Sequence, residues 1–352
     1  MCLSIRVPVC PGAFAASAEI IMAQHGFAFL AQQRFLGAAP VSGGEVTPFG
    51  VAGVAWDGAT TNRPGARFGP AAIRQASAML CDATHPLFDL DFPADAHGDA
   101  TSPAAYLQDH GDLHLPNTSL MGLRAALEPK AEALMRSQHM LWLGGDHSIT
   151  LSLLRAARKL HGQPLAVLHF DAHCDTWADH FGEPSGHGTW VYEAVQEGLV
   201  VPQGFVQVGI RSAAQREARE YVNAIGGRVI TARALLGLDG AAQLAGVVRD
   251  IAQRLQAAAA PVYLTLDIDC LDPAFAPGTG TPEPGGLSTS QVLTLLEELC
   301  VMPLPFIGMD CVEVAPSYDH AELTSNAAAV CVWTYLCARL AAVGHAGTAA
   351  KA

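Results

Sequence analysis

Short apolar runs alternate with helical patterns along most of this chain of 352 residues, and this alternation limits the folds that it can adopt. Near-continuous apolar strands separated by helices are typical of parallel strands buried on both faces, because each parallel connection needs a crossover segment, usually a helix. Half of the residues are hydrophobic, which is ample for one large core. We therefore predict a three-layer α/β fold, with a central parallel sheet and helices on both faces.

No internal repeat or low-complexity linker divides the chain, so we predict one domain at residues 46–345. Residues 1–45 are expected to be an N-terminal extension that is poorly ordered in part, and residues 82–119 a long irregular excursion. The predicted strands are Gly50–Ala55, Met140–Leu143, Leu165–Phe170, Phe205–Ile210, Arg228–Thr231, Val262–Ile268 and Phe306–Met309. The predicted helices are Pro70–Leu80, Leu120–Gln138, Ile149–Lys159, Gly188–Glu197, Ala241–Ala258, Ser290–Leu299 and Thr324–Ala341.

A net charge of −13 argues against nucleic acid and anionic membranes as partners, because both are themselves negatively charged. No apolar run reaches the roughly 18–20 residues that a membrane-spanning helix needs. The nine cysteines form no CxxC pair, which favours buried, reduced thiols over disulfides. Reduced thiols are typical of a cytoplasmic protein, so we expect a cytoplasmic location. The first 21 residues make a poor signal peptide, and Met22 is an alternative start.

Metal-competent side chains recur at every second position of the segment Asp171-Ala172-His173-Cys174-Asp175. An extended chain alternates its side chains between two faces, so residues 171, 173 and 175 point the same way. Carboxylates and an imidazole crowded on one face need a cation to compensate their charge and desolvation. Asp267 and Asp269 repeat the spacing, and His147 lies in a further polar turn. Together these residues predict a site for two metal ions.

The candidate ligands lie at or just past the ends of predicted strands, and the carboxyl ends of parallel strands meet at one edge of a sheet, where ligands bind. A single aspartate at such an end is more often a cap or loop residue, but six converging groups favour a metal site. Four carboxylates and two imidazoles without a thiolate suit Mn²⁺ better than a structural zinc site. By contrast, Asp109-His110-Gly111-Asp112 lacks a strand-end setting, and His169 is expected in the core or behind the ligands.

Three long motifs resemble the signatures of the ureohydrolase (arginase/agmatinase) family, and shorter ones agree in order. The long motifs are Gly144-Gly145-Asp146-His147-Ser148, His169-Phe170-Asp171-Ala172-His173-Cys174-Asp175-Thr176 and Asp267-Ile268-Asp269-Cys270-Leu271-Asp272-Pro273. The shorter ones are Thr61-Asn62-Arg63-Pro64-Gly65-Ala66-Arg67-Phe68-Gly69-Pro70, Ser185-Gly186-His187-Gly188-Thr189 and Cys311-Val312-Glu313-Val314-Ala315-Pro316-Ser317-Tyr318-Asp319. The resemblance spans about residues 50 to 340 and implies an arginase-like fold.

The resemblance also implies a role for each matching residue. One metal ion would be held by His147, Asp171, Asp175 and Asp267, and the other by Asp171, His173, Asp267 and Asp269, so that Asp171 and Asp267 bridge. Glu313 matches the carboxylate that holds a substrate guanidinium, and His187 matches a mobile histidine that passes protons to the leaving amine. Asp175 would help to stabilise the tetrahedral intermediate.

The implied activity is hydrolysis of a guanidino compound to urea and an amine, with two Mn²⁺ ions as cofactor. The motifs look most like those of agmatinases, so agmatine, which yields putrescine, is the expected substrate. The alternative is a guanidino acid such as 4-guanidinobutyrate or 3-guanidinopropionate, with Arg63 or Arg67 holding its carboxylate unless they form structural salt bridges. A zinc deacetylase of related fold and a catalytically silent homologue are further candidates, and a trimer or hexamer is the expected assembly.

Overall fold

The computed structural model describes residues 33–40, 46–80, 84–88 and 106–349. They form a nine-stranded sheet with the order β1-β3-β2-β4-β9-β8-β5-β6-β7, and every pairing is parallel. The strands are β1 Ala39–Pro40, β2 Phe49–Val54, β3 Leu107–Asp112, β4 His139–Gly144, β5 Leu165–Phe170, β6 Val200–Ile210, β7 Arg228–Thr231, β8 Val262–Asp267 and β9 Phe306–Val312. The predicted central parallel sheet is therefore confirmed.

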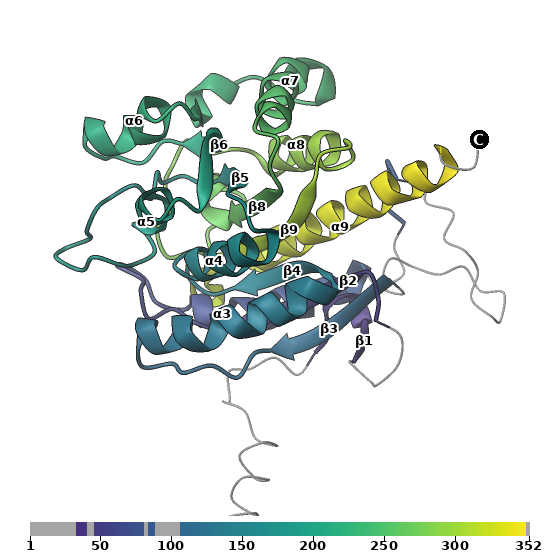
Figure 1. The fold of residues 1–352 in the computed structure, drawn as a ribbon, viewed down its shortest axis with the longest axis horizontal. Helices are drawn as coiled ribbons and strands as arrows, with labels where there is room; N and C mark the ends of the chain where they lie inside the picture. The colour runs from purple at the N-terminus through teal and green to yellow at the C-terminus, as the bar shows by residue number, and fades with distance from the viewer. Residues whose placement is uncertain (1–32, 41–45, 81–83, 89–105, 350–352) are drawn as a thin grey trace, which may run out of the picture.

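Helices cover both faces of the sheet, as Figure 1 shows. The helices α2, α7, α8 and α9 contribute to the apolar cluster on one face, and α3, α4, α5 and α6 contribute to the cluster on the other. Their bounds are α2 Gly69–Ser77, α3 Leu120–Ser137, α4 Ile149–His161, α5 Trp190–Gln196, α6 Arg216–Ala224, α7 Ala241–Ala257, α8 Thr289–Cys300 and α9 Leu323–Ala349. This is the three-layer arrangement that the apolar pattern predicts.

The two faces of a central strand supply both cores, because successive side chains point in opposite directions. In β4, Leu141 and Leu143 belong to one apolar cluster, while Met140 and Trp142 belong to the other. All four side chains are fully buried. Burial on both faces explains why such strands read as continuous apolar runs rather than as alternating ones.

The expectation of an irregular excursion at residues 82–119 is wrong for the part that forms β3. This strand is polar in sequence, but Asp109 and Asp112 are buried against the guanidinium of Arg74 in α2. Burial in ion pairs replaces the apolar contacts that identify other strands. The prediction also omits the short helix α6, whose buried apolar residues are limited to Ala218 and Val222.

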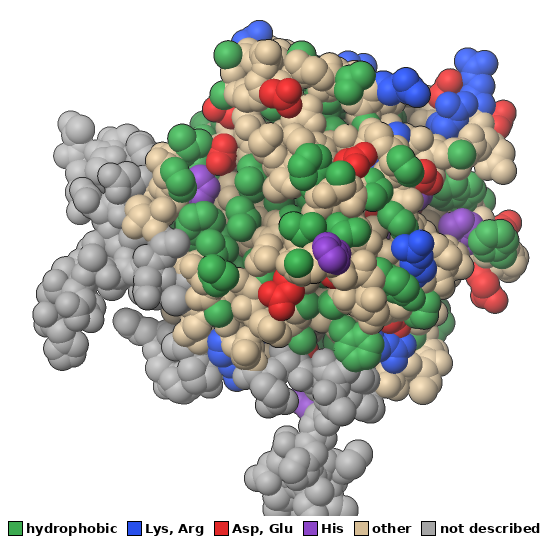
Figure 2. Space-filling view, turned by 180° about the vertical axis from the view of Figure 1, so that it is seen from behind, with side chains coloured by type: hydrophobic (Ala, Val, Ile, Leu, Met, Phe, Trp, Pro, Cys, Tyr) green, Lys and Arg blue, Asp and Glu red, His purple; other side chains and the backbone are tan. Residues whose placement is uncertain are grey.

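Residues at the start of the described chain also pack on the core, since Phe35 and Leu36 are buried and β1 pairs with β3. Residues 1–32 lie outside the described part, and the domain boundary at residue 46 stays a prediction. No helix in the described ranges is long and apolar enough to cross a membrane. On the face seen in Figure 2, acidic and basic side chains are interspersed rather than sorted into patches of one sign.

Candidate metal centre

Four neighbouring strands bring polar groups to one edge of the sheet. Asp171 directly follows β5, Asp267 is the last residue of β8, Glu313 directly follows β9, and His147 comes three residues after β4. These strands are adjacent in the order β4-β9-β8-β5, so segments far apart in sequence meet at their carboxyl ends. A parallel sheet places ligand sites at this edge.

The imidazole of His147 faces three carboxylates. Its Nδ1 lies 3.1 Å from Oδ2 of Asp171, 3.3 Å from Oδ2 of Asp175 and 3.2 Å from Oδ2 of Asp267. All four side chains are buried, and this Nδ1 has no hydrogen-bond partner among the described residues. A buried nitrogen without a partner among converging carboxylate oxygens is the arrangement that a cation would complete.

A second set of donors adjoins the first. The Nδ1 of His173 lies 3.1 Å from Oδ2 of Asp269 and 3.4 Å from Oδ1 of Asp171. The two oxygens of Asp171 therefore face different imidazoles, with Oδ2 toward His147 and Oδ1 toward His173. One carboxylate thus adjoins both sets, which is the arrangement expected of a bridging ligand between two nearby metal ions.

Two of the buried carboxylates, Asp175 and Asp267, have raised pKa values. Burial, followed by the charge of Asp171, raises the pKa of Asp175 to about 8. Burial and the charge of Asp269 raise the pKa of Asp267 well above its usual range. A bound cation would relieve both penalties, since it favours the ionised forms. The electrostatics of the cluster therefore fit a positively charged occupant.

Trp190, the first residue of α5, contacts residues of the first set of donors. Sequence reasoning missed this residue. Its indole Nε1 donates a hydrogen bond of 2.7 Å to Oδ2 of Asp175, and its ring packs at 4.9 Å from the rings of both His147 and His169. Asp175 itself has a left-handed backbone with φ of 53°. A strained backbone and a fixed side chain are typical of a group that must point in one direction.

His169 contacts the set without offering a free nitrogen. Its Nε2 lies 2.7 Å from Oδ2 of Asp171, and its Nδ1 lies 3.2 Å from the amide nitrogen of Gln207. Both ring nitrogens thus have protein partners, and both side chains are fully buried. His169 lies close enough to the set to join it by distance alone, but these contacts make it a residue that holds Asp171 in place.

A second network holds His147 from the opposite side. The Nε2 of His147 lies 2.8 Å from the hydroxyl of Thr265, which donates to Oδ1 of Asp310 at 2.5 Å. Oδ2 of Asp310 accepts hydrogen bonds from Tyr263 and Thr150. Sequence reasoning did not single out Asp310, because a buried aspartate inside an apolar strand is recognisable only from its partners. This series of hydrogen bonds fixes the imidazole of His147 so that its Nδ1 faces the carboxylates.

Glu313 and His187 lie beside the metal-competent groups. Oε1 of Glu313 accepts hydrogen bonds from the backbone N–H of His147 at 2.9 Å and lies 3.0 Å from Nδ1 of His187. Its Oε2 is buried and has no hydrogen-bond partner in the described part of the chain. On the far side of the imidazole ring, Nε2 of His187 lies 2.8 Å from the hydroxyl of Thr61.

The pKa of His187 is raised to about 9. Burial lowers it, but the hydrogen bond and the charge of Glu313, together with more distant carboxylates, outweigh burial. These contacts with carboxylates therefore favour the protonated imidazole at neutral pH.

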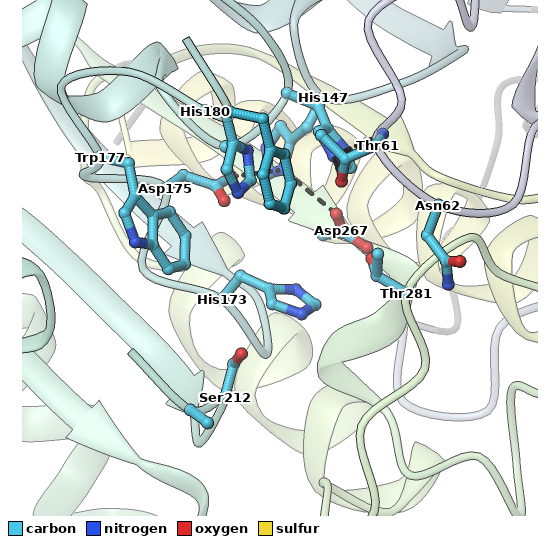
Figure 3. A pocket seen from close by; sticks show the side chains of 14 residues that line it. Thr61, Asn62, His147, His173, Asp175, Trp177, His180, Ser212, Asp267 and Thr281 are labelled. Atoms are coloured by element: carbon cyan, nitrogen blue, oxygen red, sulfur yellow. Dashed lines mark hydrogen bonds and ion pairs between the residues drawn. The ribbon is translucent and has the colours of Figure 1, made fainter. Parts of the chain in front are cut away.

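A cavity of about 270 Å³ has His147, His173, Asp175, Asp267 and His187 among its lining residues (Figure 3). Trp177 and His180 stand on one side of it and Thr61 and Asn62 on the other, with Asp267 between them. Neither Arg63 nor Arg67 lines it. Arg67 pairs with the buried carboxylate of Asp57, and the guanidinium of Arg63 lies 5.3 Å from the ring centre of Tyr318.

All six predicted ligands and both predicted substrate residues therefore meet at one edge of the sheet, whereas Asp109 and Asp112 lie in β3 and pair with Arg74. The family model described as the arginase family matches residues 47–337. The chain belongs to the arginase family. Membership makes it a ureohydrolase, an enzyme whose metal-site residues are present and whose substrates carry a guanidino group.

Relatives within the arginase family are similar in sequence to this chain over most of their length. An agmatinase from Chromobacterium violaceum is 41% identical over 288 residues, which cover 82% of each chain. A proclavaminate amidinohydrolase from Streptomyces clavuligerus is 40% identical, covering 78% of this chain and 82% of the relative. The crystal structure of a hypothetical agmatinase from Burkholderia thailandensis superimposes with a TM-score of 0.73 at 38% identity, covering 88% of this chain and 91% of that one.

Proposed function

We propose that this member of the arginase family hydrolyses agmatine to putrescine and urea with two Mn²⁺ ions. The observation that carries the proposal is the unpaired Oε2 of Glu313, a buried carboxylate oxygen beside the cluster of metal-competent groups. A buried acceptor without a partner costs free energy, and a cationic guanidinium would satisfy it. The cluster beside it supplies what hydrolysis needs at the same place.

Two metal ions would be held by the residues that the motifs indicate. His147, Asp171, Asp175 and Asp267 would bind one ion, and Asp171, His173, Asp267 and Asp269 the other. The shared contacts of Asp171 support its bridging role. Bound metal ions would supply the Lewis acidity that makes water a sufficient nucleophile for a resonance-stabilised guanidinium.

The protein groups would orient the substrate. Oε1 of Glu313 is tied to the backbone of His147, so Oε2 stays directed away from that bond and can accept a guanidinium N–H. A charge-assisted hydrogen bond to a planar cation restricts its rotation and holds its carbon in one position. Asp175, fixed by Trp190, would accept a hydrogen bond from the hydroxyl that hydrolysis adds to this carbon.

His187 would then serve the leaving amine. Its Nδ1 contacts Glu313, which favours the imidazolium, and its Nε2 faces Thr61 at the wall of the cavity. A proton transferred from the imidazolium to the departing nitrogen would allow the C–N bond to break, and the hydroxyl on the carbon would pass its proton to Asp175, which leaves urea and a free amine.

The lining of the cavity supports agmatine over a guanidino acid. No Lys or Arg side chain of the described residues lines the cavity, so a substrate carboxylate would lack a cationic partner there. The nearby Arg211 donates its N–H groups to backbone carbonyls, among them those of Asp269 and Glu283. The relative named for proclavaminate, itself a carboxylate, keeps a guanidino acid as the second candidate.

Urea release from a substrate panel tests the proposal. The Mn²⁺-loaded protein would be assayed with agmatine, arginine, 4-guanidinobutyrate, 3-guanidinopropionate and guanidine, and kcat/KM compared as free-energy differences. We expect agmatine to give the highest value. A guanidino acid that exceeds agmatine tenfold would overturn the substrate and leave the metal chemistry intact. A trimeric or hexameric assembly and a cytoplasmic location stay predictions.

A further inference from the structure

Three aromatic rings stack at the mouth of the cavity. The ring of His180 lies 5.1 Å from that of Trp177 with an angle of 11° between their planes. The ring of Phe181 lies 5.1 Å from that of His180, with an angle of 3° between their planes. The indole Nε1 of Trp177 donates a hydrogen bond to Gln215, which anchors the stack to the residue before α6. We call Trp177, His180 and Phe181 the aromatic stack.

The position of Phe181 is energetically unfavourable. Phe181 is 89% exposed and has a left-handed backbone with φ of 56°. It precedes Gly182, whose φ is 88°, in a tight turn closed by backbone hydrogen bonds between His180 and Glu183. A bulky residue with positive φ is strained, and an exposed phenyl ring forgoes burial. Strain and exposure at the mouth of a catalytic cavity point to a binding role.

The aromatic stack also joins two cavities. A second cavity of about 540 Å³ adjoins the first, and both are lined by Thr61, His180 and Phe181. The second cavity extends to Met121 in α3 and to the turn that carries Glu183. A molecule anchored by its guanidinium beside the metal centre can therefore extend past the stack into the outer cavity.

The chemistry of the two linings favours a cation. Among the described residues, neither lining includes Lys or Arg, and Glu183 contributes a carboxylate to the outer one. The pKa of His180 is lowered, chiefly by burial, so its ring is neutral at physiological pH. Neutral aromatic faces attract cations and cover alkyl chains, and they carry no positive charge that would pair with a carboxylate.

We propose that the aromatic stack and the outer cavity form a tail subsite that receives an alkyl chain ending in a cation. The inference deepens the proposed function, since it assumes that the guanidinium end lies at Glu313. The tail subsite selects substrates by the group at their distal end and accepts chains longer than that of agmatine.

Removal of the outer ring tests this subsite. Phe181→Ala and Phe181→Asn both delete the ring, and asparagine tolerates a left-handed backbone, which separates loss of the ring from strain. Phe181→Tyr keeps the ring, and Leu236→Ala removes an exposed apolar side chain that lines neither cavity. Each Mn²⁺-loaded variant would be assayed for kcat/KM with agmatine, 8-aminooctylguanidine, butylguanidine and methylguanidine.

We expect both ring deletions to lower kcat/KM for agmatine and for the eight-carbon homologue about tenfold relative to methylguanidine, mainly through KM. Phe181→Tyr and Leu236→Ala should leave this ratio unchanged. Equal losses for methylguanidine and agmatine would show that the stack is structural and overturn the subsite. Failure to accept the longer chain, or equal values for butylguanidine and agmatine in the unmodified protein, would do the same.

A protein that releases urea from none of these compounds refutes the proposed function instead. Calorimetric binding of the same four guanidines to the Mn²⁺-loaded protein then tests the subsite independently. Tighter binding of agmatine than of methylguanidine, lost in Phe181→Asn, would support it, and identical affinities would overturn it.

Discussion

At the scale of single residues, hydrogen bonds to neighbouring groups hold the candidate site residues in position. Asp175 is held by the indole of Trp190, His147 by Thr265, and Glu313 by the backbone of His147. Glu313 and Asp175 both have positive φ values, at 63° and 53°. The surrounding packing must offset that strain, so changes outside the ligands are expected to alter the centre.

Trp190→Phe should weaken, by about tenfold to a hundredfold, binding of the metal ion to which we assign Asp175 as a ligand. The change keeps an aromatic ring and removes the N–H that fixes the carboxylate. Trp333→Phe is the matched control, because its buried Nε1 has no hydrogen-bond partner in the described part of the chain. Metal titration by calorimetry measures both. Equal affinities in the two variants would contradict a positioning role for Trp190.

His187→Ala should retain both metal ions and lower kcat by about a hundredfold, since it removes acid–base help and no ligand. The raised pKa of His187 means that its acid form prevails below about pH 9 and is lost as pH rises through that value. Bound cations disfavour the imidazolium, so kcat of the unmodified protein should fall at or below that pH. This alkaline fall should vanish in the variant. Loss of metal from His187→Ala would make this residue a ligand or a structural group.

At the scale of helices and strands, a buried ion-pair network holds α2 against β3, where apolar side chains would usually make the contact. The guanidinium of Arg74 in α2 is fully buried and donates to both oxygens of Asp109 and to Asp112 in β3. The same carboxylate of Asp109 accepts the backbone N–H of Phe35. The network thereby connects helix α2, strand β3 and the start of the described chain.

Arg74→Met should lower the free energy of unfolding by about 3–5 kcal/mol, because it leaves two buried carboxylates without their cation. Arg254→Met is the control, since its partner Asp250 lies one helical turn away and both side chains are partly exposed, and it should cost at most about 0.5 kcal/mol. Urea denaturation midpoints compare the two. Similar small losses would show that β3 is held by its backbone pairing alone.

The sequence predicted those elements and residues whose signals are local. Buried strands such as β4 and β5 are apolar throughout, and Asp171 and Asp267 come at strand ends, so both the sheet and the convergence of the ligands could be anticipated. β3 could not, because its polar residues are satisfied by Arg74, more than thirty positions away. Trp190 was missed for the same reason, since its hydrogen bond to Asp175 depends on how α5 packs.

At the scale of the whole molecule, metal binding should contribute to folding stability. The candidate ligands lie at or just after the ends of β4, β5 and β8, which are far apart in sequence. Ions that bind these groups only in the folded protein would stabilise it relative to the unfolded chain. Thermal unfolding with and without Mn²⁺ should show a higher Tm with metal. The increase should be almost lost in Asp171→Asn, which adjoins both sets of donors, and only reduced in Asp175→Asn. An equal increase in all three proteins would refute the bridging role of Asp171.

The strand order also has a consequence for folding during synthesis. β9 is the last strand to be synthesised, yet it lies between β4 and β8 and is the sole connection between β1-β3-β2-β4 and β8-β5-β6-β7 in the described sheet. His147 belongs to the first of these halves, and Asp171 and Asp267 to the second. Until residues 306–312 leave the ribosome, the nascent chain carries all six candidate ligands but lacks the strand that joins the two halves of the described sheet, so the facing edges of β4 and β8 have no partner.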